Sequence, residues 1–211
     1  MKLVRKSGIL LHPTSLPGPD GIGDLGPEAY RWVDFLNKSG TQLWQILPLG
    51  PTGYGDSPYQ CFSAFAGNPF LISPVVLLED ELLTSDDLKE RPFFPVGDID
   101  YGPAIEWKTH LLNKAFDAFT KQGDSLLKAE FDRFCDQKKA WLDDYALFMA
   151  IKETQDLHPW VDWPEPLKTR KTIAIEEAKT MLADKIAKHK FNQFLFFRQW
   201  LRLKAFAVEK K

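Results

Sequence analysis

Residues 43–69 read LWQILPLGPTGYGDSPYQCFSAFAGNP. The apolar run at the start, residues 43–47, predicts a short buried strand. Prolines and glycines then recur between residues 48 and 58, which excludes a helix and disfavours a regular strand. The strand is therefore expected to end in a long irregular loop over residues 47–69. Loops held by a rigid scaffold are where functional residues concentrate.

A second apolar run lies near the N-terminus. Residues 4–11 predict a first strand, in which three apolar side chains are buried. These side chains are Ile9, Leu10 and Leu11. A loop rich in proline and glycine follows over residues 12–23.

A helix is expected to connect the two strands. Pro27 is favoured in a first helical turn, and Gly40 is a good stop. The apolar face of this helix consists of Ala29, Val33 and Leu36. With the next strand over residues 42–47, the order strand–loop–helix–strand predicts a right-handed βαβ unit of a parallel sheet.

The rest of the chain is expected to be mainly helical. Residues 70–78 predict a strand-like or irregular packed segment, and residues 80–101 predict a polar connection broken by prolines. Amphipathic helices follow from Pro103, and two more helices are expected over residues 174–188 and 190–207, the last of them buried. The aromatic and aliphatic positions that define the first two are Trp107, Leu111, Ala115 and Phe119, then Leu127, Phe131, Phe134, Trp141, Tyr145 and Phe148.

Residues 21–26, GIGDLG, match the dinucleotide-binding pattern GxGxxG, but their context does not fit it. The pattern should follow a strand directly and should precede an acidic residue by about 20 positions. Here three prolines separate it from the first strand, and no Asp or Glu occurs between Asp34 and Asp56. We therefore expect no nucleotide cofactor. We expect no cofactor of another kind either.

Composition excludes several classes of protein. A chain of 211 residues is enough for one domain, with room for an insertion, and a net charge of −2 gives no reason to expect a nucleic-acid partner. Cys61 and Cys135 are expected to be reduced cytosolic thiols. No apolar run is long enough for a signal peptide or a membrane span, which predicts a cytoplasmic protein. The histidines lack the spacing of metal ligands; they are His12, His110, His158 and His189.

Two interpretations of the loop over residues 47–69 remain open from the residues alone. Tyr54 and Tyr59 offer flat amphipathic rings, and the polar side chains beside them suit the hydroxyls of a sugar. These polar side chains are Asp56, Ser57, Gln60 and Asn68. The alternative is a purely structural turn, because DSP and NP are good turn sequences. Elsewhere, Tyr101, Trp160 and Trp163 are interpreted as local packing.

Five segments of the chain, taken in order, resemble the N-terminal part of the amylomaltases, the 4-α-glucanotransferases of glycoside hydrolase family 77. They are GILLHPTSLPG (8–18), GIGDLG (21–26), QILPLGP (45–51), YGDSPYQ (54–60) and SAFAGNP (63–69). WPEP at 163–166 and the helix over residues 194–202 also fit this family. The resemblance covers nearly the whole chain.

The resemblance implies an α/β fold, the N-terminal part of a (β/α)8 barrel with a largely helical insertion. Residues 1–102 would start the catalytic barrel with its first strand, first helix and second strand, and residues 103–211 would form the insertion. The loop over residues 47–69 would then lie at the carboxyl end of the second strand, where barrel enzymes build their sites. The barrel would be incomplete in this chain.

The resemblance also implies a reaction and a set of binding residues. The family transfers α-1,4-glucan segments by retaining chemistry, which needs two carboxylates about 5–5.5 Å apart. Tyr59 would stack on a glucose ring, while Ser57 and Asp56 would bind hydroxyl groups. Tyr54 and Tyr101 would form a second glucan groove.

The catalytic carboxylates of the family belong to later strands of the barrel. No catalytic residue is therefore assigned, and the chain alone is expected to be inactive. The alternatives are a truncated chain that only binds α-glucan, or a helical protein-interaction module. The oligomeric state stays open.

Overall fold

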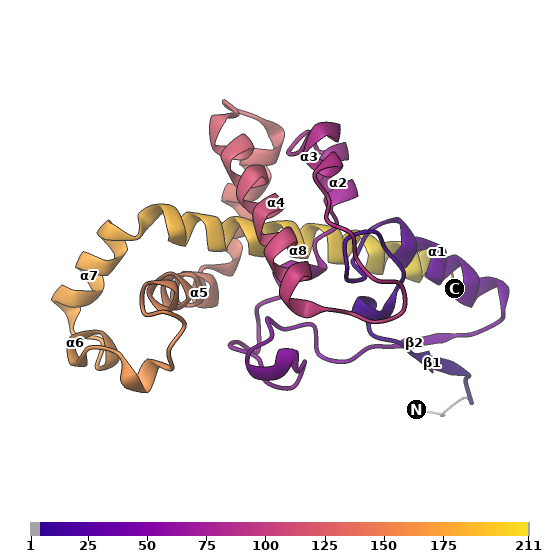
Figure 1. Ribbon diagram of the computed structural model, residues 1–211, viewed down its shortest axis with the longest axis horizontal. Helices are drawn as coiled ribbons and strands as arrows, with labels where there is room; N and C mark the ends of the chain where they lie inside the picture. The colour runs from indigo at the N-terminus through magenta and orange to yellow at the C-terminus, as the bar shows by residue number, and fades with distance from the viewer. Residues whose placement is uncertain (1–4, 211) are drawn as a thin grey trace. The chain divides into compact units, whose positions relative to one another are not determined.

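Two parallel strands and the helix between them form the N-terminal part of the fold (Figure 1). The structure, a computed structural model, describes residues 5–210, apart from the side chain of Tyr54. β1 (Gly8–Leu10) pairs in parallel with β2 (Leu43–Gln45), and Ile9 lies opposite Trp44. α1 (Pro27–Lys38) connects the strands. The parallel βαβ unit predicted from the sequence is confirmed.

Both ends of α1 lie where the sequence predicts them. Pro27 occupies the first turn. At the other end, Gly40 has a φ of +71°, and its N–H donates to the carbonyl of Asn37 at 3.0 Å. The N–H of Thr41 donates to the carbonyl of Leu36 at 2.9 Å. This pair of bonds is a Schellman motif, in which glycine adopts the left-handed conformation without steric cost. The apolar face is buried as predicted, through Ala29, Val33 and Leu36.

The prediction that both strands are buried is wrong. Leu10 is 53% exposed and Leu43 is 49% exposed. Ile9 and Trp44 lie on the opposite face of the sheet and are half-buried. Trp32 of α1 packs edge-on against Trp44, with ring centroids 6.5 Å apart. α1 thus covers one face of the sheet, and the face with the two leucines has no cover within the described residues.

Seven further helices follow among the described residues. They are α2 (Pro74–Glu79), α3 (Ser85–Lys89), α4 (Tyr101–Lys121), α5 (Leu126–Thr154), α6 (Glu165–Lys168), α7 (Thr172–Met181) and α8 (Ala183–Glu209). Four short 3-10 turns lie between the longer elements: η1 (Pro13–Ser15), η2 (Tyr54–Asp56), η3 (Pro69–Leu71) and η4 (Trp160–Asp162).

Several predictions for this helical region need correction. Residues 70–78, expected to be strand-like or irregular, include the end of η3 and most of α2, which Pro74 starts in a favoured first-turn position. The connection over residues 80–101 contains α3, which Thr84 and Asp87 stabilise through a capping box. Tyr101 is the first residue of α4 and not a loop residue.

The last two helices divide at Leu182 and not near residue 189. Neither position carries a glycine or proline, so the sequence held no strong indication of the boundary. α8 is buried on all sides only over residues 191–196, and Leu201 is 57% exposed further along. Full burial of this helix was therefore predicted over too long a range.

The chain forms two compact units. The first comprises Met1–Gly123 with Leu195–Lys211, and the second comprises Asp124–Phe194. In the second unit, Trp163 is 7% exposed and packs against Phe148, with ring centroids 5.3 Å apart. This confirms the prediction that Trp163 belongs to a packed loop, whereas Trp160 is 53% exposed.

A network of buried polar groups joins the loop before α1 to α4 within the first unit. The Nζ of Lys108, whose side chain is 1% exposed, donates to Asp24 Oδ2 at 2.9 Å and to the carbonyl of Ile72 at 3.0 Å. Asp20 Oδ1 accepts from Arg91 Nε and from Trp107 Nε1, both at 2.8 Å. The acidic residues of this loop therefore serve the fold.

We predict that Lys108→Met strongly destabilises the first unit. The substitution leaves the Asp24 carboxylate and the Ile72 carbonyl without their buried partner, which costs about 3–5 kcal/mol. Denaturant unfolding measures the loss. Lys114→Met is the matched control, because the Lys114 side chain is 33% exposed and ion pairs near the surface, such as those with Asp87 and Glu90, contribute little to stability. Equal stability of the two variants would contradict the assigned role.

We also predict an acid-sensitive ion pair in the second unit. Glu153 of α5 lies 2.9 Å from His189 Nε2 and 3.3 Å from Lys185 Nζ of α8. Burial raises the pKa of Glu153, but these cationic neighbours outweigh it and lower the pKa to about 2. Because the folded-state pKa lies below the ordinary value of 4.5, the stabilisation of up to about 3 kcal/mol is present above about pH 4.5 and is lost towards pH 2.

The variant Glu153→Gln should lose this pH dependence. Amide exchange in α5 and α8 should show a smaller loss of protection for Glu153→Gln than for the wild type on acidification. Asp144→Asn is the control, because Asp144 pairs with Arg170 at the surface. If acidification reduces amide protection as much in Glu153→Gln as in the wild type, a group other than Glu153 causes the loss.

Candidate functional site

The loop that follows β2 is closed at its base by backbone pairing. The N–H of Gly53 donates to the carbonyl of Gln60 at 2.8 Å, and the N–H of Phe62 donates to the carbonyl of Pro51 at 3.3 Å. Thr52 and Cys61 form an antiparallel bridge between these bonds. Residues 53–60 therefore form a turn with a fixed base, which we call the exposed turn.

Three predicted site residues lie on the exposed turn. The ring of Tyr59 is 71% exposed, and its backbone N–H donates to Ser57 Oγ at 3.3 Å. Asp56 follows Gly55, and both have a positive φ, of 52° and 66°. Aspartate is one of the few residues that tolerate this conformation. The turn thus brings an aromatic ring, a hydroxyl and a carboxylate within four residues of one another; their role in binding stays a prediction.

The two other predicted site residues lie on different elements. Tyr54 begins η2, but its side chain is outside the described residues. Tyr101 begins α4 and is half-buried. The groove that these tyrosines were expected to share stays a prediction.

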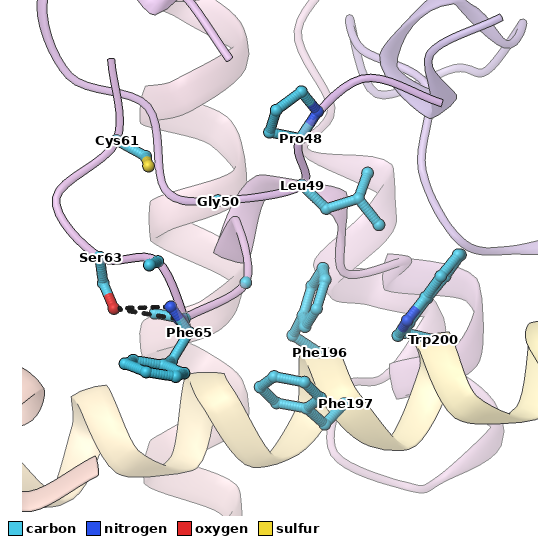
Figure 2. A pocket seen from close by; sticks show the side chains of 12 residues that line it. Pro48, Leu49, Gly50, Cys61, Ser63, Phe65, Phe196, Phe197 and Trp200 are labelled. Atoms are coloured by element: carbon cyan, nitrogen blue, oxygen red, sulfur yellow. Dashed lines mark hydrogen bonds between the residues drawn. The ribbon is translucent and has the colours of Figure 1, made fainter. Parts of the chain in front are cut away.

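A hollow of about 300 Å³ lies beneath the loop in the first unit (Figure 2). Figure 2 shows Pro48 and Leu49 on one side, and the rings of Phe196, Phe197 and Trp200 on α8. The remaining lining residues are Gly50, Cys61, Ser63, Ala64, Phe65, Ala66 and Gly67. Ser57 and Tyr59 are not among the lining residues, so the exposed turn and the hollow are separate features.

Close packing holds the loop against the α8 side chains that line the hollow. A Cβ at Gly67 would lie 2.0 Å from the ring of Phe196, so only glycine fits there. Ser63 Oγ accepts from the N–H groups of Phe65 and Ala66, both at 3.1 Å. Asn68 is buried; its N–H donates to the carbonyl of Leu49 and its side chain accepts from Phe70 N–H. For Asn68, the purely structural interpretation is the one the contacts support.

The sequence analysis did not find the aromatic residues that support the loop. Phe196, Phe197 and Trp200 were assigned only to a buried helix, and more than a hundred residues separate them from the loop. No periodicity relates segments so far apart. The aromatic density of α8 and the glycine at position 67 were the available indications.

His12 lies at the same edge of the sheet, directly after β1. Its Nδ1 accepts from the N–H of Thr14 at 3.3 Å and lies 2.7 Å from Thr14 Oγ1. Burial lowers the pKa of the imidazole, and the backbone carbonyl of Pro48 partly offsets this effect. The sequence analysis considered His12 only as a possible metal ligand.

The site has the groups that a sugar requires and no metal cluster in the part of the chain described. An aromatic face stacks on the apolar face of a pyranose, while hydroxyl and carboxylate groups bind its hydroxyls. Across residues 5–210, no set of three or more His, Cys, Asp or Glu side chains is grouped to hold a metal ion. None of the described helices combines the length and apolar character needed to cross a membrane.

Comparison with known proteins identifies close relatives. The 4-alpha-glucanotransferase of Thermus thermophilus is 50% identical over 205 residues, which is 97% of this chain and 40% of that protein. The 4-alpha-glucanotransferase of Synechocystis sp. is 45% identical over 206 residues, which is 98% of this chain and 41% of that protein. The chain thus spans about two fifths of the length of these relatives.

Solved structures agree with the sequence relatives. The amylomaltase from Streptococcus agalactiae, in complex with acarbose, matches with a TM-score of 0.92 and 38% identity over 98% of this chain and 42% of that one. The amylomaltase from Corynebacterium glutamicum matches with a TM-score of 0.69 over 97% of this chain and 29% of that one; its 19% identity supports the fold alone.

A sequence profile decides the family. The profile described as 4-alpha-glucanotransferase, for glycoside hydrolase family 77, matches residues 11–211. The match covers nearly the whole chain and agrees with the resemblance carried by the five N-terminal segments. The chain therefore belongs to the 4-alpha-glucanotransferases of glycoside hydrolase family 77.

Proposed function

We propose that this chain forms the N-terminal, glucan-binding part of a transferase that moves α-1,4-glucan segments between maltooligosaccharides. The observation that carries the proposal is the family match over residues 11–211, supported by the TM-score of 0.92 to an amylomaltase solved with acarbose. The chain spans only about 40% of its relatives, so the activity is proposed for the longer protein to which such a segment belongs.

The exposed turn is the proposed contact with the donor sugar. Tyr59 stacks on a glucose ring, because its ring is held outward by a turn with a fixed base. Ser57 and Asp56 bind glucose hydroxyls from the same turn. Tyr54 and Tyr101 form a second glucan groove, a role that rests on the family resemblance alone.

The barrel assignment is part of the proposal. β1, α1 and β2 are the first strand, first helix and second strand of a (β/α)8 barrel, and their parallel pairing supports this. Residues 1–102 belong to the barrel, and residues 103–211 form the helical insertion. The compact units divide elsewhere because α4 and the end of α8 pack with the N-terminal segment.

The catalytic carboxylates belong, on this proposal, to the part of the family's chain outside these 211 residues. A barrel needs eight strands and typically about 250 residues, and the described residues contribute two strands to it. Retaining transfer needs a nucleophile and an acid/base carboxylate, and no residue here is assigned to either role. We place the protein in the cytoplasm, with an α-1,4-glucan as its partner and neither nucleic acid nor membrane.

The first prediction from this function concerns activity. The purified 211-residue chain, incubated with maltotriose, should form neither maltose nor longer maltodextrins, because both carboxylates of the reaction are missing. Chromatography of the products measures this. Turnover by the pure chain would contradict the proposal that the catalytic carboxylates lie outside these 211 residues.

The second prediction concerns binding. Tyr59→Ala should weaken maltoheptaose binding by about five- to tenfold, the loss expected for an aromatic stacking contact, while Tyr59→Phe should retain most of the affinity. Phe65→Ala is the matched control, because Phe65 is 66% exposed but belongs to the hollow. Affinity electrophoresis in maltodextrin gels measures the difference.

The result also separates the alternative function. If the wild-type chain is not retarded in the gel and instead co-elutes with a protein from its own cells, the helical interaction module replaces the glucan-binding proposal.

A further inference from the structure

A second pocket in the first unit is formed by α1, α2, α8 and the residue Leu25 before α1. Its volume is about 240 Å³, and none of its lining residues belongs to the loop over residues 47–69. Leu25, Pro27 and Val76 give it an apolar wall. Pockets for drug-sized ligands measure about 300–1,000 Å³, so this pocket suits a smaller molecule.

Three polar side chains around the pocket have groups that the protein itself does not use. Tyr30 lies on α1, Glu79 on α2 and Arg202 on α8, and all three line the pocket. Within residues 5–210, none of their side chains makes a hydrogen bond or an ion pair. Glu79 and Arg202 therefore present opposite charges to one pocket without pairing with each other. A ligand between them can accept from the guanidinium and donate to the carboxylate.

The elements that carry these side chains are held firmly together. The side chain of Arg198 forms an ion pair with Asp80, which links α8 to the end of α2. Gln199, which also lines the pocket, is 2% exposed. Its Oε1 accepts from the N–H of Ser73 at 2.7 Å, and its Nε2 donates to the Ser73 carbonyl at 3.4 Å. An amide group has two N–H donors, so the floor of the pocket has one more to offer.

The Tyr30 hydroxyl is available both as a donor and as an acceptor. Its ring packs against Phe206 of α8, with ring centroids 5.0 Å apart, which positions the hydroxyl. Burial raises the pKa of Tyr30, while Arg202 opposes this rise and Glu79 adds to it. The hydroxyl therefore keeps its proton at neutral pH.

This set of groups fits a neutral molecule with several hydroxyls. The charges of Glu79 and Arg202 balance, so the pocket does not favour a ligand with a net charge. Each sugar hydroxyl both donates and accepts, so neighbouring hydroxyls of one ring can bond to the guanidinium, the carboxylate and the Tyr30 hydroxyl together. The C–H groups of the same ring can contact the apolar wall.

We propose that the pocket formed by α1, α2 and α8 binds one molecule of glucose, with Tyr30, Glu79 and Arg202 as its hydrogen-bonding groups. The inference rests on the proposed function, because segment transfer from maltotriose leaves glucose as the smallest remainder of the donor. The pocket thus binds a product of the proposed reaction, apart from the loop over residues 47–69.

An NMR titration of the isotope-labelled 211-residue chain with glucose tests this inference. The backbone amides of Glu79 and Arg202 and the side-chain amide of Gln199 should shift together. A ligand as small as glucose is expected to bind with a Kd of about 1 mM. Absence of these shifts up to about 50 mM glucose, far above that Kd, would overturn the proposal.

Substitutions then assign the binding to the pocket. Arg202→Leu should weaken glucose binding about tenfold, because it removes a hydrogen bond from a charged donor. Tyr30→Phe should weaken it about threefold, because it removes one neutral hydroxyl and keeps the ring against Phe206. Lys204→Leu is the matched control, because Lys204 is exposed on α8 but does not line the pocket.

Lys204→Leu should bind glucose like the wild type. Equal affinity of Arg202→Leu and wild type would overturn the assignment of glucose to this pocket. If Arg202→Leu fails to fold, Tyr30→Phe decides in its place.

Leucine tests the competing class of ligand. An amino acid carries a carboxylate for Arg202 and an ammonium group for Glu79, and its side chain could contact the apolar wall. Leucine should leave the pocket resonances unchanged. Shifts caused by leucine and not by glucose would contradict the inference.

A comparison with maltoheptaose separates the possible failures. Tyr59→Ala, which should weaken maltoheptaose binding, should bind glucose like the wild type. Glucose binding in the pocket of a chain that does not bind maltoheptaose would refute the proposed function and retain the pocket. Maltoheptaose binding that depends on Tyr59, without glucose shifts at the pocket, would refute the pocket and retain the proposed function.

Discussion

The buried ammonium group of Lys108 is the contact on which the first unit depends. Its Nζ reaches Asp24, in the loop before α1, and the carbonyl of Ile72, just before α2. Three segments far apart in sequence therefore converge on one charge. A lysine that is 1% exposed is stable only when its charge is paired and its protons are bonded. Placing α4 elsewhere would leave that charge uncompensated.

The same loop shows why a sequence pattern needs its structural context. GIGDLG at residues 21–26 matches a nucleotide-binding pattern, yet its acidic residue is directed to the protein itself. Asp24 Oδ1 accepts the N–H of Gly26 at the start of α1, while Oδ2 pairs with Lys108. Both oxygens of Asp24 therefore serve the fold. The burial of Asp20 was not foreseen, since carboxylates usually remain at the surface.

Local sequence patterns predicted the helices that have start and stop residues or a regular apolar spacing. Pro27 and Gly40 delimit α1, and the four-residue spacing from Trp107 to Phe119 follows the buried face of α4. Predictions of burial failed where burial depends on which other elements pack against the segment. Leu10 and Leu43 are apolar but exposed, because α1 covers only the other face of the strands. The irregular loop over residues 47–69 was predicted, whereas the aromatic residues of α8 that line the hollow were not.

The candidate site combines irregular backbone with fixed geometry. Residues 47–69 contain one bridge and one short 3-10 turn, η2, and η3 begins only at Pro69, so little repetitive hydrogen bonding holds them. Their order comes instead from single contacts at each end. At the far end, Gly67 packs on Phe196 and Asn68 bonds to Leu49 and Phe70.

The near end of this loop has a different kind of anchor. There, Pro48 follows β2 at the edge of the sheet where His12 follows β1, and the N–H of Thr14 donates to His12 Nδ1. The far anchor is apolar and amide-based, so it has no group that changes charge between pH 5 and 8. The near end continues directly from β2, whose pairing with β1 fixes its position. The turn with Ser57 and Tyr59 therefore lies between an end fixed by strand pairing and an end fixed by close packing.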